Sequence, residues 1–230
     1  MSLIKKTFKY LAFAFIGFLL FSFLWVVLYK FINPPVTTMM LYNYFQQDEY
    51  EIKQEWRDLE DINKSVPLAF IAAEDQLFIW HSGFDIDAIK KAYEYNQKGK
   101  NTLGASTISQ QVAKNVFLLP NRSFIRKGLE AYFTVLIEAV WGKRRIIEVY
   151  VNIVELGEGI YGVEAAAHEF FEINADELHL SESALMAAVL PNPILYQIGA
   201  PSTKVFRKKN WIIKQMKNLG GEQLVQHWYD

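Results

Sequence analysis

The sequence predicts a mainly α-helical domain carried by one N-terminal transmembrane helix. Three observations support this class. Residues 10–29 contain no charged side chain, most of the later chain repeats apolar residues at helical spacing, and the alternation typical of β-strands is scarce. The chain has 230 residues, of which 51% are hydrophobic and 15% aromatic. That content suits a buried core and excludes a disordered chain.

The uncharged run at residues 10–29 is the first element. A helix of 20 residues spans about 30 Å, the thickness of a bilayer's hydrocarbon core. Three lysines precede the run and one directly follows it, so we expect residues 1–9 in the cytoplasm and the rest of the chain outside. A cleaved signal peptide is the alternative. The run is longer than a signal peptide's apolar region and lacks a small-x-small cleavage site, so we expect an uncleaved anchor.

The charge balance changes once the anchor is set aside. The first 30 residues hold four of the 24 basic residues and none of the 25 acidic ones. The outer part is therefore mildly acidic, which argues against a nucleic-acid-binding protein. Its basic residues still cluster locally, which suits a small anionic ligand or lipid headgroups. The absence of cysteine excludes disulfides, a thiolate nucleophile and a cysteine-ligated zinc site.

Residues 30–60 are expected to form a membrane-proximal segment that leaves the bilayer in extended form at Pro34-Pro35, and residues 61–230 a single domain. Turn and cap signals divide that domain, including a capping box at Thr107-x-x-Gln110. The basic face of its last helix is expected to be solvated rather than bound to headgroups. The expected helices cover residues 66–79, 84–97, 107–117, 123–141, 143–154, 163–171, 181–190 and 205–219.

Glu74 and Asp75 are the first candidates for chemistry, because they lie inside the apolar run LAFIAAEDQLFIW. Burying an ionised carboxylate costs several kcal/mol unless it is paired. Such an environment raises the pKa of a carboxyl group, as a general acid or base at neutral pH requires. The alternative is a helix whose polar edge happens to hold both residues.

Arg126, Lys127 and Glu130 form a second candidate group. Their spacing places two cations and one carboxylate on nearly the same face of a helix. Ordinary ion pairing within the helix explains this pattern. A charged wall facing an anionic substrate, with Glu130 holding a divalent cation, is the functional alternative.

The polar stretch at residues 104–115 is the third candidate. The hydroxyls of Ser106 and Thr107 at a helix N-terminus suit an anion-binding cradle, and Gln110 and Lys114 lie one turn apart. A plain capped amphipathic helix is the alternative.

Two further motifs are misleading. Gly157-x-Gly159-x-x-Gly162 matches a dinucleotide fingerprint, but a helical pattern precedes it where a strand is required, so we expect a helix-to-helix turn. His168-Glu169-x-x-Glu172 lacks the second histidine of a zinc-protease helix and is expected to be a helix surface.

Five blocks in this order resemble the family 51 glycosyltransferases, the peptidoglycan polymerases. The resemblance covers roughly residues 65 to 200 and departs from the usual second block only in having Ala105 in place of a glycine. The blocks are Glu74-Asp75-Gln76-Leu77-Phe78-x-x-His81-x-Gly83-x-Asp85, the stretch from Gly104 to Asn115, Arg126-Lys127-x-x-Glu130-Ala131, Ile147-Glu148-x-Tyr150-x-Asn152, and Ser181-Glu182-x-Ala184-x-x-Ala187-Ala188 with Pro191-Asn192-Pro193.

The resemblance implies a lysozyme-like, two-lobed helical fold. It also implies an inverting transferase that polymerises lipid II into β-1,4-linked glycan strands and releases undecaprenyl pyrophosphate. The chain ends about 40 residues after the fifth block without a Lys-Thr-Gly motif, so we expect the monofunctional type without a transpeptidase domain. The expected location is the bacterial plasma membrane, with a single span and the catalytic domain on the periplasmic or outer face.

The resemblance also implies roles for individual residues. Glu74 would be the general base, and Glu130 would assist the leaving pyrophosphate, directly or through a bound Mg²⁺ or Mn²⁺. The remaining residues of the cleft would bind substrate: Ser106, Thr107, Gln110, Gln111, Lys114, Arg122, Arg126 and Lys127. Expected partners are lipid II, the growing glycan, the bilayer and proteins of cell-wall synthesis, with no nucleic acid. Four apolar side chains near Arg122 would either enter the bilayer or join the core: Phe117, Leu118, Leu119 and Phe124.

Two other functions stay open at this point. A lysozyme-like hydrolase would use carboxylates in such a cleft but has no need of cations for a pyrophosphate. A non-catalytic scaffold anchored in the membrane would not need Glu74.

Overall fold

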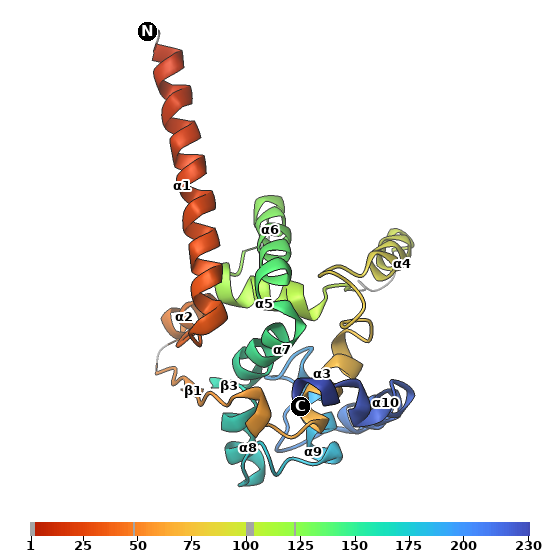
Figure 1. The fold of residues 1–230 in the computed structure, drawn as a ribbon. Coiled ribbons are helices and arrows are strands. Elements are labelled where there is room, and N and C mark those ends of the chain that lie inside the picture. Colours follow the sequence, from red (N-terminus) through yellow and green to blue (C-terminus); the bar gives the residue numbers. More distant parts are fainter. Residues whose placement is uncertain (1–2, 48, 100–103, 122) are drawn as a thin grey trace.

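The computed structural model describes residues 3–47, 49–99, 104–121 and 123–230. Within these ranges the protein has ten α-helices and three short strands, which confirms the mainly helical class. Helix α1 (Leu3–Phe31) projects as a single rod from a helical body (Figure 1). By length and composition α1 can cross a membrane.

The membrane-proximal segment is more structured than expected. It contains helix α2 (Thr38–Gln46), which the sequence analysis did not predict, strand β1 (Lys53–Gln54) and the short 3₁₀ helix η1 (Leu59–Asp61). The hydroxyl of Thr38 donates to the backbone carbonyls of Asn115 and Leu118 and so ties α2 to the body.

The three strands form one small sheet in the order β1-β3-β2. Strand β3 (Ile160–Tyr161) lies between β1, which runs parallel to it, and β2 (Glu155–Gly157), which runs antiparallel. Residues on both sides of position 60 therefore belong to the same sheet.

Of the glycines that resemble a dinucleotide fingerprint, Gly157 ends β2, Gly159 lies in the turn and Gly162 follows β3. The expected helix-to-helix turn is therefore wrong, because β2 and β3 form a hairpin there. Gly159 and Gly162 have φ angles of 71° and 81°. A Cβ atom on Gly159 would lie 2.2 Å from the carbonyl oxygen of Glu51, and one on Gly162 would lie 2.6 Å from that of Asn152. Close backbone approach explains these two glycines.

Eight helices build the rest of the body, and seven of them match the expected ranges within two residues. The exception is the first, which ends at Glu74 rather than at residue 79, because Asp75 turns away to bind another helix. The observed ranges are α3 (Ser65–Glu74), α4 (Ile86–Gln97), α5 (Ile108–Phe117), α6 (Phe124–Val140), α7 (Gly142–Ile153), α8 (Val163–Phe171), α9 (Leu180–Val189) and α10 (Thr203–Asn218).

Helix α3 is the centre of the core. Eight of its ten residues are buried, and it packs against α7, α9 and α10. Helix α5 packs between α6 and α7, and α4 stands away from the body (Figure 1). The chain closes with two 3₁₀ helices, η2 (Gly221–Leu224) and η3 (Gln226–Trp228).

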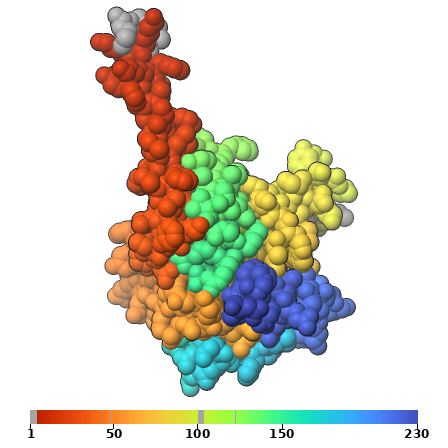
Figure 2. Space-filling view, viewed as in Figure 1, coloured from red at the N-terminus to blue at the C-terminus, as the bar shows by residue number. Residues whose placement is uncertain are grey.

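The anchor is fixed to the body along its C-terminal half. Helix α1 runs beside α6 (Figure 2). The hydroxyls of Ser22 and Tyr132 are hydrogen-bonded at 2.7 Å, and the indole N–H of Trp141 donates to the carbonyl of Val26 at 2.7 Å. Arg145 donates to the carbonyl of Tyr29 at 3.0 Å. Polar contacts of this kind orient α1 relative to the domain.

Candidate active site

A cleft of about 740 Å³ lies where the end of α3, the start of α5 and the first half of α10 meet. Its lining combines three carboxylates, two hydroxyls, two amides and one amine with apolar side chains. The polar residues among them include Glu74, Asp85, Ser106, Gln111 and Lys208.

Glu74 is the last residue of α3 and faces into this cleft. Its side chain is 20% exposed. Burial raises the pKa of the Glu74 carboxyl group above its usual range, while the ammonium of Lys208 and a hydrogen bond from Gln111 oppose that rise. Glu74 therefore lies in the cleft and not on a solvated edge of the helix, and its role as general base stays a prediction.

Gln111 orients the carboxylate of Glu74. Its Nε2 donates to Glu74 Oε2 at 3.0 Å, and its Oε1 accepts from the Tyr150 hydroxyl at 3.0 Å. Tyr150 is fully buried on α7, and burial raises the pKa of its hydroxyl well above the usual value, so the hydroxyl stays a donor. The Tyr150 hydroxyl therefore fixes which end of the Gln111 amide faces Glu74.

Asp75 connects α3 to α5. Its buried carboxylate accepts from the backbone N–H of Ile108 at 3.0 Å and contacts His81 Nε2 at 2.9 Å. The backbone N–H of Gly83 donates to His81 Nδ1, so the ring proton lies on Nε2 and points at Asp75. Asp75 thus positions the first turn of α5 and has no free oxygen for chemistry.

The remaining residues of this segment are also explained by contacts. A Cβ atom on Gly83, whose φ is 90°, would lie 2.7 Å from the side chain of Thr134. Asp85 caps α4 by accepting from the N–H of Ala88. Phe78 is completely buried, and the ammonium of Lys143 lies 4.5 Å from the centre of its ring.

The capping box at the start of α5 is confirmed. Thr107 Oγ1 accepts from the N–H of Gln110, while the Gln110 side chain accepts from the N–H of Thr107. The Thr107 hydroxyl also donates to the carbonyl of Gly83 at 2.7 Å. Both side chains are buried. Ser106, one residue earlier, is exposed and lines the cleft.

Helix α6 pairs Glu130 with both neighbouring cations. Arg126 donates to one carboxylate oxygen at 2.6 Å, and Lys127 donates to the other. Glu130 is only 2% exposed. On α5, burial lowers the pKa of Lys114, and Glu130 and Glu74 both act to raise it. Lys114 is therefore the cation that links the two acidic groups electrostatically.

The residues around Glu130 do not fit a metal ion held by the protein. Both of its oxygens already bind cations. Among the described residues, the group of three acidic or histidine side chains close enough to share an ion is Glu55, Glu164 and His168. Glu164 there accepts from Arg57 at 2.6 Å, so that group carries its own countercharge.

Lys208 is the cleft residue that the sequence analysis missed. Its Nζ lies 3.8 Å from Glu74 Oε1, so the expectation of a fully solvated basic face on α10 is wrong at this position. A signal was present. Val205, Ile212 and Met216 form the buried stripe of α10, and Lys208 interrupts that stripe at helical spacing.

Of the predicted site residues, Glu74, Ser106, Thr107 and Gln111 line this cleft. The lining does not include Gln110, Lys114, Arg126, Lys127 or Glu130. Arg122 lies outside the described residues, so its predicted role stays a prediction. Phe117 and Leu118 join the core, whereas Leu119 and Phe124 are 63% and 99% exposed. Two of the four apolar side chains thus join the core, and entry of the other two into the bilayer stays a prediction.

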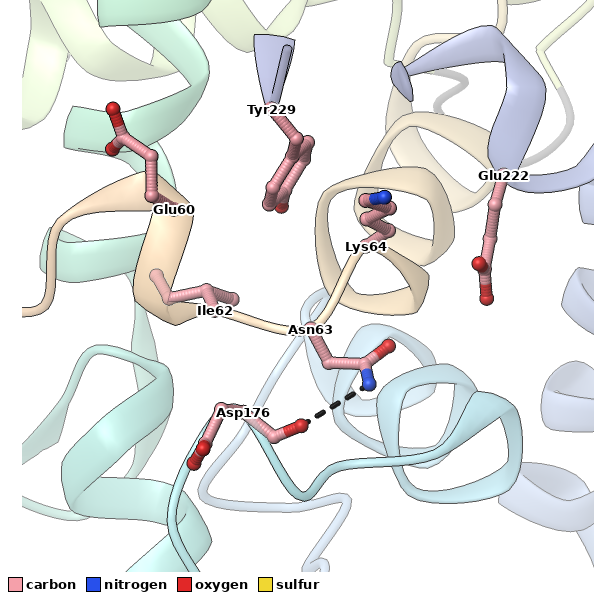
Figure 3. Close-up of a pocket in the computed structure, with 7 residues that line it drawn as sticks. All are labelled: Glu60, Ile62, Asn63, Lys64, Asp176, Glu222 and Tyr229. Carbon is pink, nitrogen blue, oxygen red and sulfur yellow. Dashed lines mark hydrogen bonds between the residues drawn. The ribbon is translucent and has the colours of Figure 1, made fainter.

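A second pocket, of about 360 Å³, lies between η1, α3 and the C-terminal turns (Figure 3). None of the predicted site residues lines it. Two of its polar side chains already have partners. Asn63 donates to the carbonyl of Asp176 at 3.1 Å, and Lys64 donates to Gln226 and lies 5.3 Å from the ring centre of Tyr229.

Known proteins are similar to this chain over most of its length. Residues 40–217 match the family model described as Transglycosylase. A protein of Shewanella oneidensis is 50% identical over 219 residues, which cover 94% of each chain. Proteins of Xanthomonas campestris pv. campestris (strain B100) and Xylella fastidiosa are 48% and 47% identical, over 89% and 88% of this chain and 85% of their own. All three carry the name biosynthetic peptidoglycan transglycosylase.

Proposed function

The chain belongs to the transglycosylase family, and from this premise we propose that it is a peptidoglycan glycosyltransferase that polymerises lipid II and releases undecaprenyl pyrophosphate. The observation that carries the proposal is Glu74, a carboxylate held in an open cleft in surroundings that raise its pKa. The family indicates the reaction, and this carboxylate could serve as the general base that the reaction needs.

In the proposed reaction the 4-hydroxyl oxygen of the acceptor sugar attacks the anomeric carbon of the donor. Glu74 accepts the hydroxyl proton as the new carbon–oxygen bond forms. The bond between the anomeric carbon and the pyrophosphate oxygen breaks, and the lipid pyrophosphate leaves with its electron pair. Attack from the opposite side converts an α-linked donor into a β-linked product. Gln111 holds Glu74 Oε2 by a hydrogen bond of 3.0 Å, which leaves Oε1 to face the acceptor.

Cations on α5 and α6 suit the leaving group. Negative charge grows on the pyrophosphate in the transition state, and fixed cations stabilise it. Lys114, Arg126 and Lys127 supply positive charge here. Arg126 also keeps a buried Nε–H without a partner among the described residues, a donor that a phosphate oxygen would satisfy. Glu130 holds Arg126 and Lys127 by pairing with both.

The predicted divalent cation stays a prediction. Because both Glu130 oxygens are paired with cations, we assign no step to a metal. Polymerisation assayed with Mg²⁺, with Mn²⁺ and with a chelator tests this prediction directly.

We further propose that α1 anchors the enzyme in the plasma membrane, with the domain on the outer face. Support comes from the length of α1 and from the excess of lysine before its apolar run. A lipid-linked donor stays in the bilayer, so an anchored enzyme suits it. The orientation can be tested with a cysteine introduced at Glu94. In spheroplasts a membrane-impermeant thiol reagent should label this cysteine if the domain is on the outer face.

The test of the function uses the purified full-length protein, lipid II and a gel that resolves glycan chains. We expect long glycan from the wild type and from the control Glu94→Gln, an exposed glutamate on α4. We expect a loss of at least about 100-fold for Glu74→Gln. Unchanged lipid II with the wild type, or cleavage of preformed glycan, would contradict the proposal, and full activity of Glu74→Gln would contradict the base assignment.

A further inference from the structure

We propose that Lys208 on α10 is a positioning residue of this reaction: its ammonium holds the carboxylate of Glu74 ionised and oriented in the cleft. The inference rests on the proposed function, since it concerns the group assigned there as general base.

The geometry gives each carboxylate oxygen of Glu74 a separate partner. Gln111 donates to Oε2 at 3.0 Å, and the Nζ of Lys208 lies 3.8 Å from Oε1. At that separation the contact is an ion pair rather than a close hydrogen bond. Oε1 therefore keeps room to accept a hydrogen bond from the hydroxyl of an acceptor sugar while it remains next to a positive charge.

The fold makes the place of Lys208 rigid. Ser202 caps α10 by accepting from the N–H of Val205, and α10 packs against both α9 and α3. Lys208 shares the inward face with Val205 and Ile212, and its side chain is only 29% exposed. Such a cation is costly unless an anion compensates it, and Glu74 is its ion-pair partner in the cleft.

The electrostatic effects on both groups agree with this arrangement. Burial raises the pKa of Glu74, and Lys208 is the largest of the effects that oppose the rise, ahead of Gln111 and Lys114. Conversely, burial lowers the pKa of Lys208, and Glu74 is the largest effect acting against it. The other charged or titratable groups that face this pair come from several elements: Asp75, Lys114, Tyr150, Tyr196 and Lys204.

Removal of the ammonium has a predictable sign. Without Lys208, burial acts on Glu74 with less opposition, so the pKa of Glu74 rises further. A general base works only in its ionised form. Activity of the variant should therefore fall most at low pH and recover as the pH rises, and each unit of pKa shift changes the ionised fraction about tenfold at pH values below the pKa.

The experiment measures the rate of lipid II polymerisation by the full-length protein from about pH 5 to about pH 9. We compare wild type, Lys208→Met, Lys208→Arg and the control Lys214→Met, whose lysine is exposed on the same helix. We expect the acidic limb of Lys208→Met to move up by about one pH unit or more. Lys208→Arg should restore most of the wild-type profile, and Lys214→Met should not differ from wild type.

A second measurement does not depend on turnover. Carbodiimides label protonated carboxyl groups, so the pH dependence of labelling at Glu74, followed by peptide mass spectrometry, reports its pKa. We expect labelling in Lys208→Met to persist to higher pH than in wild type, with circular dichroism establishing that the variant is folded. An unfolded Lys208→Met protein is replaced in both measurements by Lys208→Gln.

The outcomes separate the inference from the function on which it rests. The inference alone would be overturned if the wild type is active and Glu74→Gln is inactive, but the Lys208 variant shows no shift in its pH profile or its labelling curve. A uniform loss of rate at every pH, without a shift, would also overturn it, because that pattern indicates a substrate contact. A wild type that does not polymerise lipid II would overturn the proposed function and this inference together.

Discussion

Replacing Asp75 by Asn tests whether a buried carboxylate holds the start of α5 in place. The substitution keeps the size of the side chain and removes its charge. In the wild type the two oxygens accept from the N–H of Ile108 at 3.0 Å and contact His81 Nε2 at 2.9 Å. An asparagine offers one acceptor and one donor in the same space.

The structure allows the cost to be estimated. The N–H of Gly83 fixes the His81 proton on Nε2, so the Asn amide must face a donor with its own NH₂ group, either at Ile108 or at His81. The loss of one hydrogen bond to a buried charged group costs about 1.5–3 kcal/mol. The loss of a negative charge at a helix N-terminus costs about 0.3–1 kcal/mol more. We therefore expect Asp75→Asn to lower the free energy of unfolding by about 3 kcal/mol.

Chemical and thermal unfolding measure this loss. For a domain of this size about 3 kcal/mol corresponds to a fall of about 6–12 °C in the unfolding temperature. Glycan synthesis should fall as well, because the first turns of α5 carry Gln111. The matched control is Asp87→Asn, since that side chain is 81% exposed, and we expect it to change stability by less than about 0.5 kcal/mol.

The reasoning about Asp75 is refuted if Asp75→Asn unfolds within about 0.5 kcal/mol of wild type. It is equally refuted if the control Asp87→Asn loses as much stability as Asp75→Asn, because the effect would then not depend on burial.

Three further expectations concern stability and pairing. Because the folded-state pKa of Glu74 is raised, ionisation of Glu74 destabilises the fold as the pH rises above the unfolded-state pKa. At pH 7 the free energy of unfolding of Glu74→Gln should therefore exceed that of wild type by about 1.4 kcal/mol per unit of pKa shift. Thermal unfolding should show this difference shrinking as the pH is lowered. Tyr150→Phe leaves the Oε1 of Gln111 unpaired and should cost about 1–2 kcal/mol and slow polymerisation, as urea unfolding and a glycan assay will show. Arg126→Met leaves the buried Glu130 with one cation and should cost about 1–3 kcal/mol and raise KM for lipid II, whereas an unchanged KM would argue against a substrate contact.

Local signals predicted most of the helices, because caps and apolar spacing act within one element. The capping box at Thr107 forms as its sequence indicates. The end of α3 was not predictable in this way. The run after Glu74 continues at helical spacing, and the bonds of Asp75 to residues on other elements end the helix there.

The candidate site was predictable in part for the same reason. Glu74 stands out in the sequence as a charge within an apolar run, and the structure places it, mostly buried, in the cleft. Its two partners come from other helices, Gln111 from α5 and Lys208 from α10. The apolar spacing of α10 places Lys208 on its inward face, but no local pattern pairs this lysine with a glutamate on α3, so the fold is needed to identify the pair.

The attachment of α1 to the body has a consequence for how the enzyme would meet its substrate. Ser22 and Val26 belong to the apolar run of the anchor, and both bind side chains of the domain. In the proposed membrane orientation the domain cannot swing on a tether, so the cleft keeps one height and one tilt above the bilayer. Each new donor must then arrive by lateral diffusion, and the encounter between enzyme and lipid becomes a search in two dimensions.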